Sequence, residues 1–203
     1  MDRKILFVGL GSLLLVALVT LGAFLFGKPE SFRGTTYVEP YPQASEIALT
    51  RADGSSFQLS QTRGKIVLLF FGYTSCPDVC PTTLAELNQA LEKLDQNERD
   101  RVQVVFVTVD PERDTPERAQ VYVNNFNPDF MGLSGTESEL TKVWDDYGVF
   151  RQIVEGSSAA GYLVDHTARV TLIDGDGNLR VSFGFDTPID DIVHDLKLVM
   201  KEQ

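Results

Sequence analysis

Apolar runs and apolar stripes alternate along the chain after residue 60. The runs at 66–71 (IVLLFF) and 102–109 (VQVVFVTV) lack the polar alternation of a half-exposed strand, so we expect central strands buried on both faces. The first run is followed by leucines at helical spacing, namely Leu84, Leu87, Leu91 and Leu94. A second helical stripe lies near the C-terminus and comprises Ile189, Ile192, Val193, Leu196 and Val199.

The segments between these stripes predict the remaining elements. Thr115 is a suitable N-cap for a helix that starts at Pro116 and runs toward Phe126, and another helix is expected around residues 137–147. Two hairpins are expected, one with its turn at Asp53-Gly54 and one that pairs residues 170–173 with 179–183. This order indicates an α/β domain with a central mixed β-sheet flanked by helices. The thioredoxin-like fold, in its peroxiredoxin-like variant, uses these elements.

Residues 5–26 (ILFVGLGSLLLVALVTLGAFLF) form an apolar run without any charge. As a helix this run would be roughly 33 Å long, enough to cross a hydrocarbon core of about 30 Å. A cleavable signal peptide would have a shorter apolar run ending at small residues, so we expect an uncleaved transmembrane helix. Arg3 and Lys4 precede the run and favour a cytoplasmic N-terminus.

The expected organisation has four parts. Residues 1–4 would be cytoplasmic, 5–26 the membrane anchor, 27–45 a linker with three prolines, and 46–203 the folded domain. Because the chain lacks a presequence of the mitochondrial kind, a single-pass protein of a bacterial inner membrane with a periplasmic domain fits best.

Charge and cysteine content narrow the possible functions. The formal net charge is −11. Because such an acidic surface repels phosphate backbones, nucleic acid is not an expected partner. The only two cysteines, Cys76 and Cys80, exclude a disulfide-rich scaffold and a four-thiolate metal site within one chain. A metal or a proton transfer that needs imidazole must use His166 or His194.

The two cysteines lie directly after the first buried run, where a strand enters a helix. Open α/β sheets place their chemistry at this position, and a helix N-terminus favours thiolate over thiol. A structural disulfide would close a loop so short that it contributes only about 2 kcal/mol, which is a weak reason for this placement. Two uses remain open: two thiolates and an imidazole could bind a soft ion such as Cu(I), or the pair could cycle between dithiol and disulfide.

Among the other candidates, His166 precedes a predicted strand in a loop that can reach the cysteines, so we expect it to be the third ligand. His194 lies on the charged side of the last helix and is expected to be solvated. Asp110 and Asp114 end a strand and open a helix, which is typical of turns and caps, with a supporting or docking role as the alternative. Residues 174–178 (DGDGN) start like a calcium loop but lack its later glycine and glutamate, so we expect a hairpin turn.

Three segments in this order resemble the Sco/SenC family: FFGYTSCPDVCPTTLAEL at 70–87, VTVDPERDTPE at 107–117 and VDHTARVTLIDGDG at 164–177. The chain departs from the family at Ser75, where members often have histidine. The resemblance implies a membrane-anchored, thioredoxin-like copper chaperone for cytochrome c oxidase assembly. It also implies that Cys76, Cys80 and His166 bind copper, as Cu(I), Cu(II) or both.

The resemblance implies partners as well as ligands. The expected customer is the dinuclear copper site of cytochrome c oxidase subunit II, supplied through an extracytoplasmic copper donor and a thiol reductant. We expect a metallochaperone rather than an enzyme, and the alternative is a thiol–disulfide oxidoreductase that reduces the cysteines of that site or of other extracytoplasmic proteins. A peroxiredoxin is disfavoured, because Tyr73 and Pro77 stand where that family has Pro and Thr ahead of the peroxidatic cysteine.

Overall fold

The computed structural model describes residues 16–17, 30–158 and 161–203, and residues 32–203 form one compact unit. Within the described part of the chain, no helix is both long and apolar enough to cross a membrane. The predicted span at 5–26 lies outside the described residues, apart from Val16 and Ala17.

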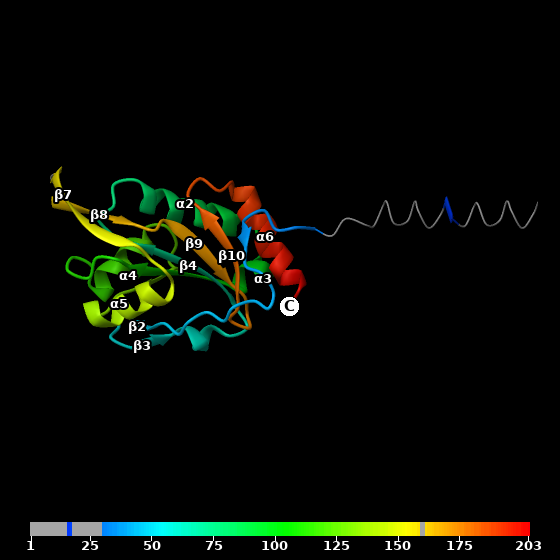
Figure 1. The fold of residues 1–203 in the computed structure, drawn as a ribbon, viewed down its shortest axis with the longest axis horizontal. Helices are drawn as coiled ribbons and strands as arrows, with labels where there is room; N and C mark the ends of the chain where they lie inside the picture. The colour runs from blue at the N-terminus through cyan, green and yellow to red at the C-terminus, as the bar shows by residue number, and fades with distance from the viewer. Residues whose placement is uncertain (1–15, 18–29, 159–160) are drawn as a thin grey trace, which may run out of the picture. The chain divides into compact units, whose positions relative to one another are not determined.

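The compact unit is built on a mixed six-stranded sheet with the order β1-β10-β9-β4-β5-β6 (Figure 1). Strands β4, β5 and β6 run parallel to one another, whereas β9 and β10 pair antiparallel with their neighbours. The strands, in sheet order, are β1 (Thr35–Thr36), β10 (Leu179–Gly184), β9 (Arg169–Ile173), β4 (Ile66–Gly72), β5 (Val102–Thr108) and β6 (Met131–Leu133). The predicted mixed central sheet is therefore confirmed, and the two short edge strands β1 and β6 are additions to it.

The central strands are apolar on both sides, so other elements pack against both faces of the sheet. Every residue of β4 is buried. Phe70 contacts Phe106 on one face, while the next residue, Phe71, contacts Tyr147 beyond the end of α5 on the other. The helices are α2 (Val79–Glu92), α3 (Gln96–Asp100), α4 (Pro116–Asn124), α5 (Glu137–Asp146) and α6 (Ile189–Lys201), and α2 packs against α6.

Two small hairpins flank the main sheet. The first joins β2 (Ala48–Thr50) and β3 (Ser56–Gln58) and confirms the turn predicted at Asp53-Gly54; a short 3₁₀ helix at Leu59–Thr62 follows it. The second joins β7 (Arg151–Ser158) and β8 (Gly161–His166) and was not predicted. Figure 1 shows this second hairpin at one end of the sheet. Its strands (RQIVEGSS and GYLVDH) follow neither a continuous apolar run nor a strict alternation of apolar and polar residues, so the periodicity of the sequence does not reveal them.

The segment expected to be a linker packs against the domain where it is described. The fully buried carboxylate of Asp195 on α6 accepts hydrogen bonds from the backbone N–H of Arg33 at 2.9 Å and of Gly34 at 2.8 Å. Strand β1 then pairs with β10. The compact unit therefore begins at Phe32 rather than at residue 46.

The same carboxylate corrects the expectation for His194. Nδ1 of His194 lies 2.9 Å from Oδ1 of Asp195, and the side chain is 22% exposed, so the histidine is only partly exposed to solvent. The contact with the carboxylate of Asp195 keeps the imidazole ring close to α6.

Gly132 on β6 allows α4 to approach the sheet edge closely. A β-carbon at this position would lie 2.5 Å from the backbone carbonyl of Ala119. We predict that Gly132→Ala lowers the free energy of unfolding by about 2–3 kcal/mol, because backbone on both sides resists the shift. Chemical denaturation would measure the loss. Gly184→Ala is the matched control, since a β-carbon there meets nothing within 4 Å, and equal losses for the two variants would contradict the prediction.

Candidate functional site

The two cysteines lie between the end of β4 and the first turn of α2. Cys80 is in the first turn of α2 and is fully buried, whereas Cys76 lies in the preceding loop and is half-buried. The backbone N–H of Cys80 donates to Sγ of Cys76 at 3.4 Å. Gly72 at the end of β4 leaves room for the inner sulfur, because a β-carbon there would lie 2.9 Å from Sγ of Cys80.

His166 reaches the cysteines from the β7–β8 hairpin. His166 is the last residue of β8, whereas the sequence had predicted it to lie in a loop. It nevertheless lies next to the cysteines, as expected. Its Nε2 lies 3.6 Å from Sγ of Cys80. Its Nδ1 lies 3.1 Å from the backbone oxygen of Thr167; donating a proton there leaves Nε2 with its lone pair directed at the sulfur. The ring also meets the buried Tyr73 edge-on, with centroids 5.8 Å apart.

A cleft of about 210 Å³ opens beside Cys76 and His166. Its other walls come from the loop before α2 and from β8, and they include Pro77, Val79 and Leu163. Across the part of the chain that the structure describes, no group of three His, Cys, Asp or Glu side chains is placed to hold a metal ion. Within the cysteine–histidine cluster, Cys76 and His166 line the surface cleft.

The two thiols have opposite acidities because their surroundings differ. Hydrogen bonding with Cys80, and then with His166, lowers the pKa of the Cys76 thiol to about 4, against the effect of its partial burial. The hydrogen bond with Cys76, followed by burial, raises the pKa of Cys80. The cluster therefore has a half-buried thiolate in front of a fully buried thiol.

One turn, between β5 and α4, fastens the cysteine loop. Asp114 is fully buried and accepts hydrogen bonds from Thr74 N–H at 2.9 Å, from Thr74 Oγ1 at 2.6 Å and from Thr108 Oγ1 at 2.8 Å. Arg118 adds a hydrogen bond to the hydroxyl of Ser75 at 3.0 Å. The residues just before Cys76 are therefore held by charge-assisted bonds to a carboxylate.

The same turn fastens the histidine hairpin. The buried carboxylate of Asp110 pairs with Arg113 and accepts a hydrogen bond from Tyr162 Oη at 2.7 Å. Arg113 donates to the backbone oxygen of Tyr162 at 2.9 Å and its guanidinium lies 3.7 Å from the centroid of that ring. Tyr162 belongs to β8, so Asp110 positions the strand that carries His166. Asp110 and Asp114 thus form a turn, as expected, since the N–H of Asp114 donates to the Asp110 oxygen at 2.9 Å, and their side chains also hold the two neighbouring segments; the helix cap is Thr115.

The other predicted features lie away from this cluster. His194 is on α6 against Asp195. The segment 174–178 forms a hairpin turn, in which Asp174 N–H donates to the Asn178 oxygen at 3.0 Å and Asn178 N–H to Oδ1 of Asp174 at 2.8 Å. The sequence assigned no role in the site to Tyr73, Arg113 or Tyr162, although the first two lie within the quoted motifs and Tyr162 lies two residues before the third motif.

Comparisons with known proteins agree with this geometry. The family model described as SCO1/SenC matches residues 37–201. A SCO2-like protein of Rickettsia prowazekii is 35% identical over 167 residues, covering 82% of this chain and 81% of the relative. The solution structure of apo Sco1 from Thermus thermophilus is 42% identical with a TM-score of 0.75, over 85% of this chain and 99% of that one. The copper-bound structure of Bradyrhizobium japonicum ScoI is 37% identical with a TM-score of 0.69, over 77% and 99%.

The different acidities predict selective modification of the cysteines. In the reduced protein, we expect iodoacetamide to alkylate Cys76 at least tenfold faster than Cys80, because only the thiolate is a nucleophile and Cys80 is buried. The rate at Cys76 should stay nearly constant from pH 7.5 down to about pH 5 and fall as the thiolate is protonated near its pKa of about 4. Peptide mapping after timed quenching measures both rates. Cys76→Ser is the control, and a rate that falls tenfold per unit below pH 8 would refute the lowered pKa.

Asp114 should contribute strongly to stability through the cysteine loop. Asp114→Ala leaves three donors on Thr74 and Thr108 without their acceptor, so we expect the free energy of unfolding to fall by about 3 kcal/mol. Glu112→Ala in the same turn removes an exposed carboxylate and should change stability by less than about 0.5 kcal/mol. Denaturant titration compares the two, and similar losses would show that Asp114 does not fasten the loop.

Proposed function

The chain belongs to the SCO1/SenC family, and from that premise we propose that it is a copper metallochaperone whose cargo is held by Cys76, Cys80 and His166. The proposal rests above all on the convergence of the three side chains, which come from segments far apart in the sequence. Two thiolates and one imidazole form a soft donor set, and such a set selects Cu(I) over harder ions.

The spacing of the donors supports a shared ion. For trigonal bonds of about 2.3 Å to sulfur and 2.0 Å to nitrogen, the two ligand atoms would be about 3.7 Å apart. The separation between Cys80 Sγ and His166 Nε2 is 3.6 Å. His166 has its Nδ1 side fixed by the Thr167 carbonyl, an arrangement that orients metal-binding histidines.

The exposure of the site supports delivery rather than storage. Cys76 opens on the cleft, so an incoming thiolate from a partner could replace one ligand at a time. The proposed recipient is the dinuclear copper site of cytochrome c oxidase subunit II, in keeping with the family resemblance. The proposed source is an extracytoplasmic copper donor.

We further propose that the cysteine pair gates the loading of copper. Formation of a Cys76–Cys80 disulfide would remove both thiolate ligands, so copper binding would require a reduced pair and a thiol reductant. In this proposal the domain works outside the cytoplasm of a bacterium, held to the inner membrane by residues 5–26 with the N-terminus in the cytoplasm.

A second function, thiol–disulfide exchange, is favoured by one observation. The low pKa of Cys76 in front of the buried Cys80 is the arrangement of an attacking thiolate with a resolving partner. Such an enzyme would reduce the cysteines of the oxidase copper site or of other extracytoplasmic proteins. It needs both cysteines but not the imidazole, so His166→Ala separates the two functions.

Copper stoichiometry tests the proposal. The reduced full-length chain, kept anaerobic in detergent, should hold one Cu(I) against a competing chromophoric chelator. Cys76→Ser and Cys80→Ser should lose this copper, and His166→Ala should weaken the affinity at least about tenfold, the effect of losing one ligand contact of about 1.4 kcal/mol or more. His194→Gln is the matched control and should bind like the wild type.

The outcomes separate the candidates. Equal affinity in His166→Ala and the wild type would refute the three-ligand site. If the reduced wild type holds no copper but reduces a disulfide substrate, and His166→Ala does the same, the oxidoreductase becomes the function.

A further inference from the structure

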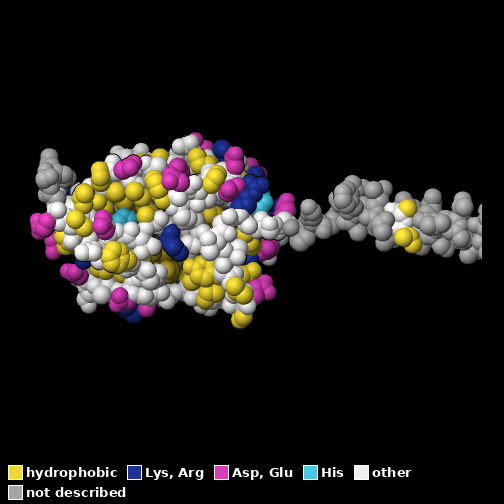
Figure 2. Space-filling model, turned by 45° about the horizontal axis from the view of Figure 1, so that its top comes forward, with side chains coloured by type: hydrophobic (Ala, Val, Ile, Leu, Met, Phe, Trp, Pro, Cys, Tyr) yellow, Lys and Arg dark blue, Asp and Glu magenta, His cyan; other side chains and the backbone are white. Residues whose placement is uncertain are grey.

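The donor cluster lies within an apolar strip on the surface, which we define as Pro77, Val79, Leu163, Ala168 and Phe185. The first three line the cleft at Cys76, and Phe185 lines a shallow notch between α2 and the loop before α6. Ala168 lines both hollows, so they adjoin. Figure 2 shows hydrophobic side chains gathered around a histidine at the end of the domain that carries the β7–β8 hairpin, with acidic side chains at their border.

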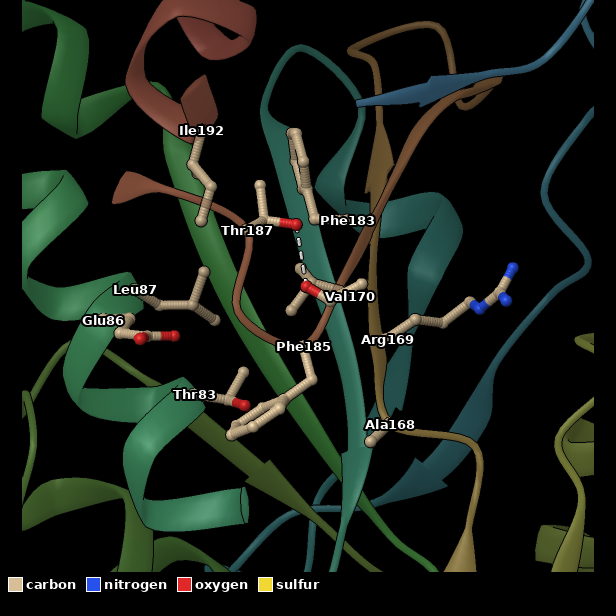
Figure 3. Close-up of a pocket in the computed structure, with 11 residues that line it drawn as sticks. Thr83, Glu86, Leu87, Ala168, Arg169, Val170, Phe183, Phe185, Thr187 and Ile192 are labelled. Carbon is tan, nitrogen blue, oxygen red and sulfur yellow. Dashed lines mark hydrogen bonds between the residues drawn. The ribbon is translucent and has the colours of Figure 1, made fainter. Parts of the chain in front are cut away.

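Phe185 is displayed by a tight turn rather than by a loose loop. The backbone N–H and the hydroxyl of Thr187 both donate to the oxygen of Gly184, the hydroxyl at 2.8 Å (Figure 3). Asp186 adopts a φ of 65°, a left-handed conformation that Asp tolerates better than most residues. The ring, which is 41% exposed, lies beside Thr83 in Figure 3. A fixed, exposed aromatic side chain is a suitable anchor for a partner.

Carboxylates border the strip. Asp78 and Asp165 line the cleft, and Glu86 lines the notch. Burial, and then the charge of Asp186, raises the pKa of Glu86. Among the described residues that line the two hollows, the one Lys or Arg is Arg169, whose side chain extends away from the notch in Figure 3.

From these features we propose that the strip is the docking site for a cysteine-bearing segment of the client protein, in which an apolar side chain and Lys or Arg residues flank the cysteine. The apolar side chain would cover Phe185, the basic residues would meet Glu86, Asp78 and Asp165, and the cysteine would face Cys76. This proposal rests on the proposed function, because it assumes that a client thiol must reach the donor cluster. It adds which clients are accepted: basic, apolar segments react, and acidic ones are repelled.

Twin peptides with an activated disulfide test the proposal without copper. Each contains one cysteine joined to 2-thiopyridine, with leucine beside it and either two Lys or two Glu. The Cys76 thiolate attacks the peptide sulfur, a Cys76–peptide disulfide forms, and the old disulfide breaks to release pyridine-2-thione, whose absorbance reports the rate. The rate of each reduced full-length variant with a peptide is divided by the rate of the same variant with 2,2′-dithiodipyridine. This normalisation removes differences in intrinsic thiol reactivity between variants.

We expect the normalised rate at low salt to be about tenfold higher for the Lys peptide than for the Glu peptide, and the ratio to shrink as salt screens the charges. Glu86→Gln should lower that ratio about twofold. Phe185→Ser should lower the Lys-peptide rate at least threefold, while Val121→Ser, which removes another exposed apolar side chain, should not.

Equal rates for the two peptides, together with no effect of Phe185→Ser, would overturn the docking site. That result is distinct from failure of the metallochaperone proposal, which shows as absence of bound copper in the stoichiometry experiment. A salt-dependent preference for Lys without any effect of Phe185→Ser would also overturn the proposal, since it would reduce recognition to general attraction by an acidic protein.

Discussion

The turn between β5 and α4 holds the candidate site together. Two fully buried carboxylates four positions apart in this turn act on different segments: Asp114 holds the loop that carries Cys76, and Asp110 holds the strand that carries His166. A buried carboxylate is costly unless its hydrogen bonds are satisfied, so each one fixes the groups that satisfy it. The distance between the histidine and the cysteines is therefore set by a third segment that contributes no ligand of its own.

The fixed geometry also explains why two identical side chains have different chemistry. Cys80 is on the inner face of α2, behind Gly72, where burial disfavours its thiolate. Cys76 lines the cleft and accepts a hydrogen bond from the N–H of Cys80 in the first turn of the helix, together with the hydrogen bonds of its neighbours. One sulfur can thus meet a partner while the other stays with the histidine. Both copper transfer and disulfide exchange need this division, which is why the geometry alone supports two functions.

Most of the fold and the ligand set could be predicted from the sequence because they depend on strong local signals. Uninterrupted apolar runs predicted β4 and β5, and the Thr115-Pro116 pair marked the start of α4. The β7–β8 hairpin could not be predicted, since it is held by contacts of Tyr162 and Arg151 with the distant turn after β5 rather than by its own pattern. The burial of Asp110 and Asp114 was hidden for the same reason: a carboxylate at a helix start is usually a cap, and only the tertiary structure shows that it faces inward.

A site that hands over its cargo must be less complete than one that keeps it. In the proposed function, copper has three protein ligands, and one of them, Cys76, lies in an open cleft where a fourth ligand from the client can reach the ion. The apolar strip around the cleft would exclude water once the client covers it. The carboxylates at the border of the strip would attract a basic client before contact, because electrostatic attraction is long-ranged, whereas the metal ligands act only on contact. In the proposed function, recognition and binding are thus assigned to different residues: the buried carboxylates position the metal-binding side chains, and the exposed carboxylates select the client.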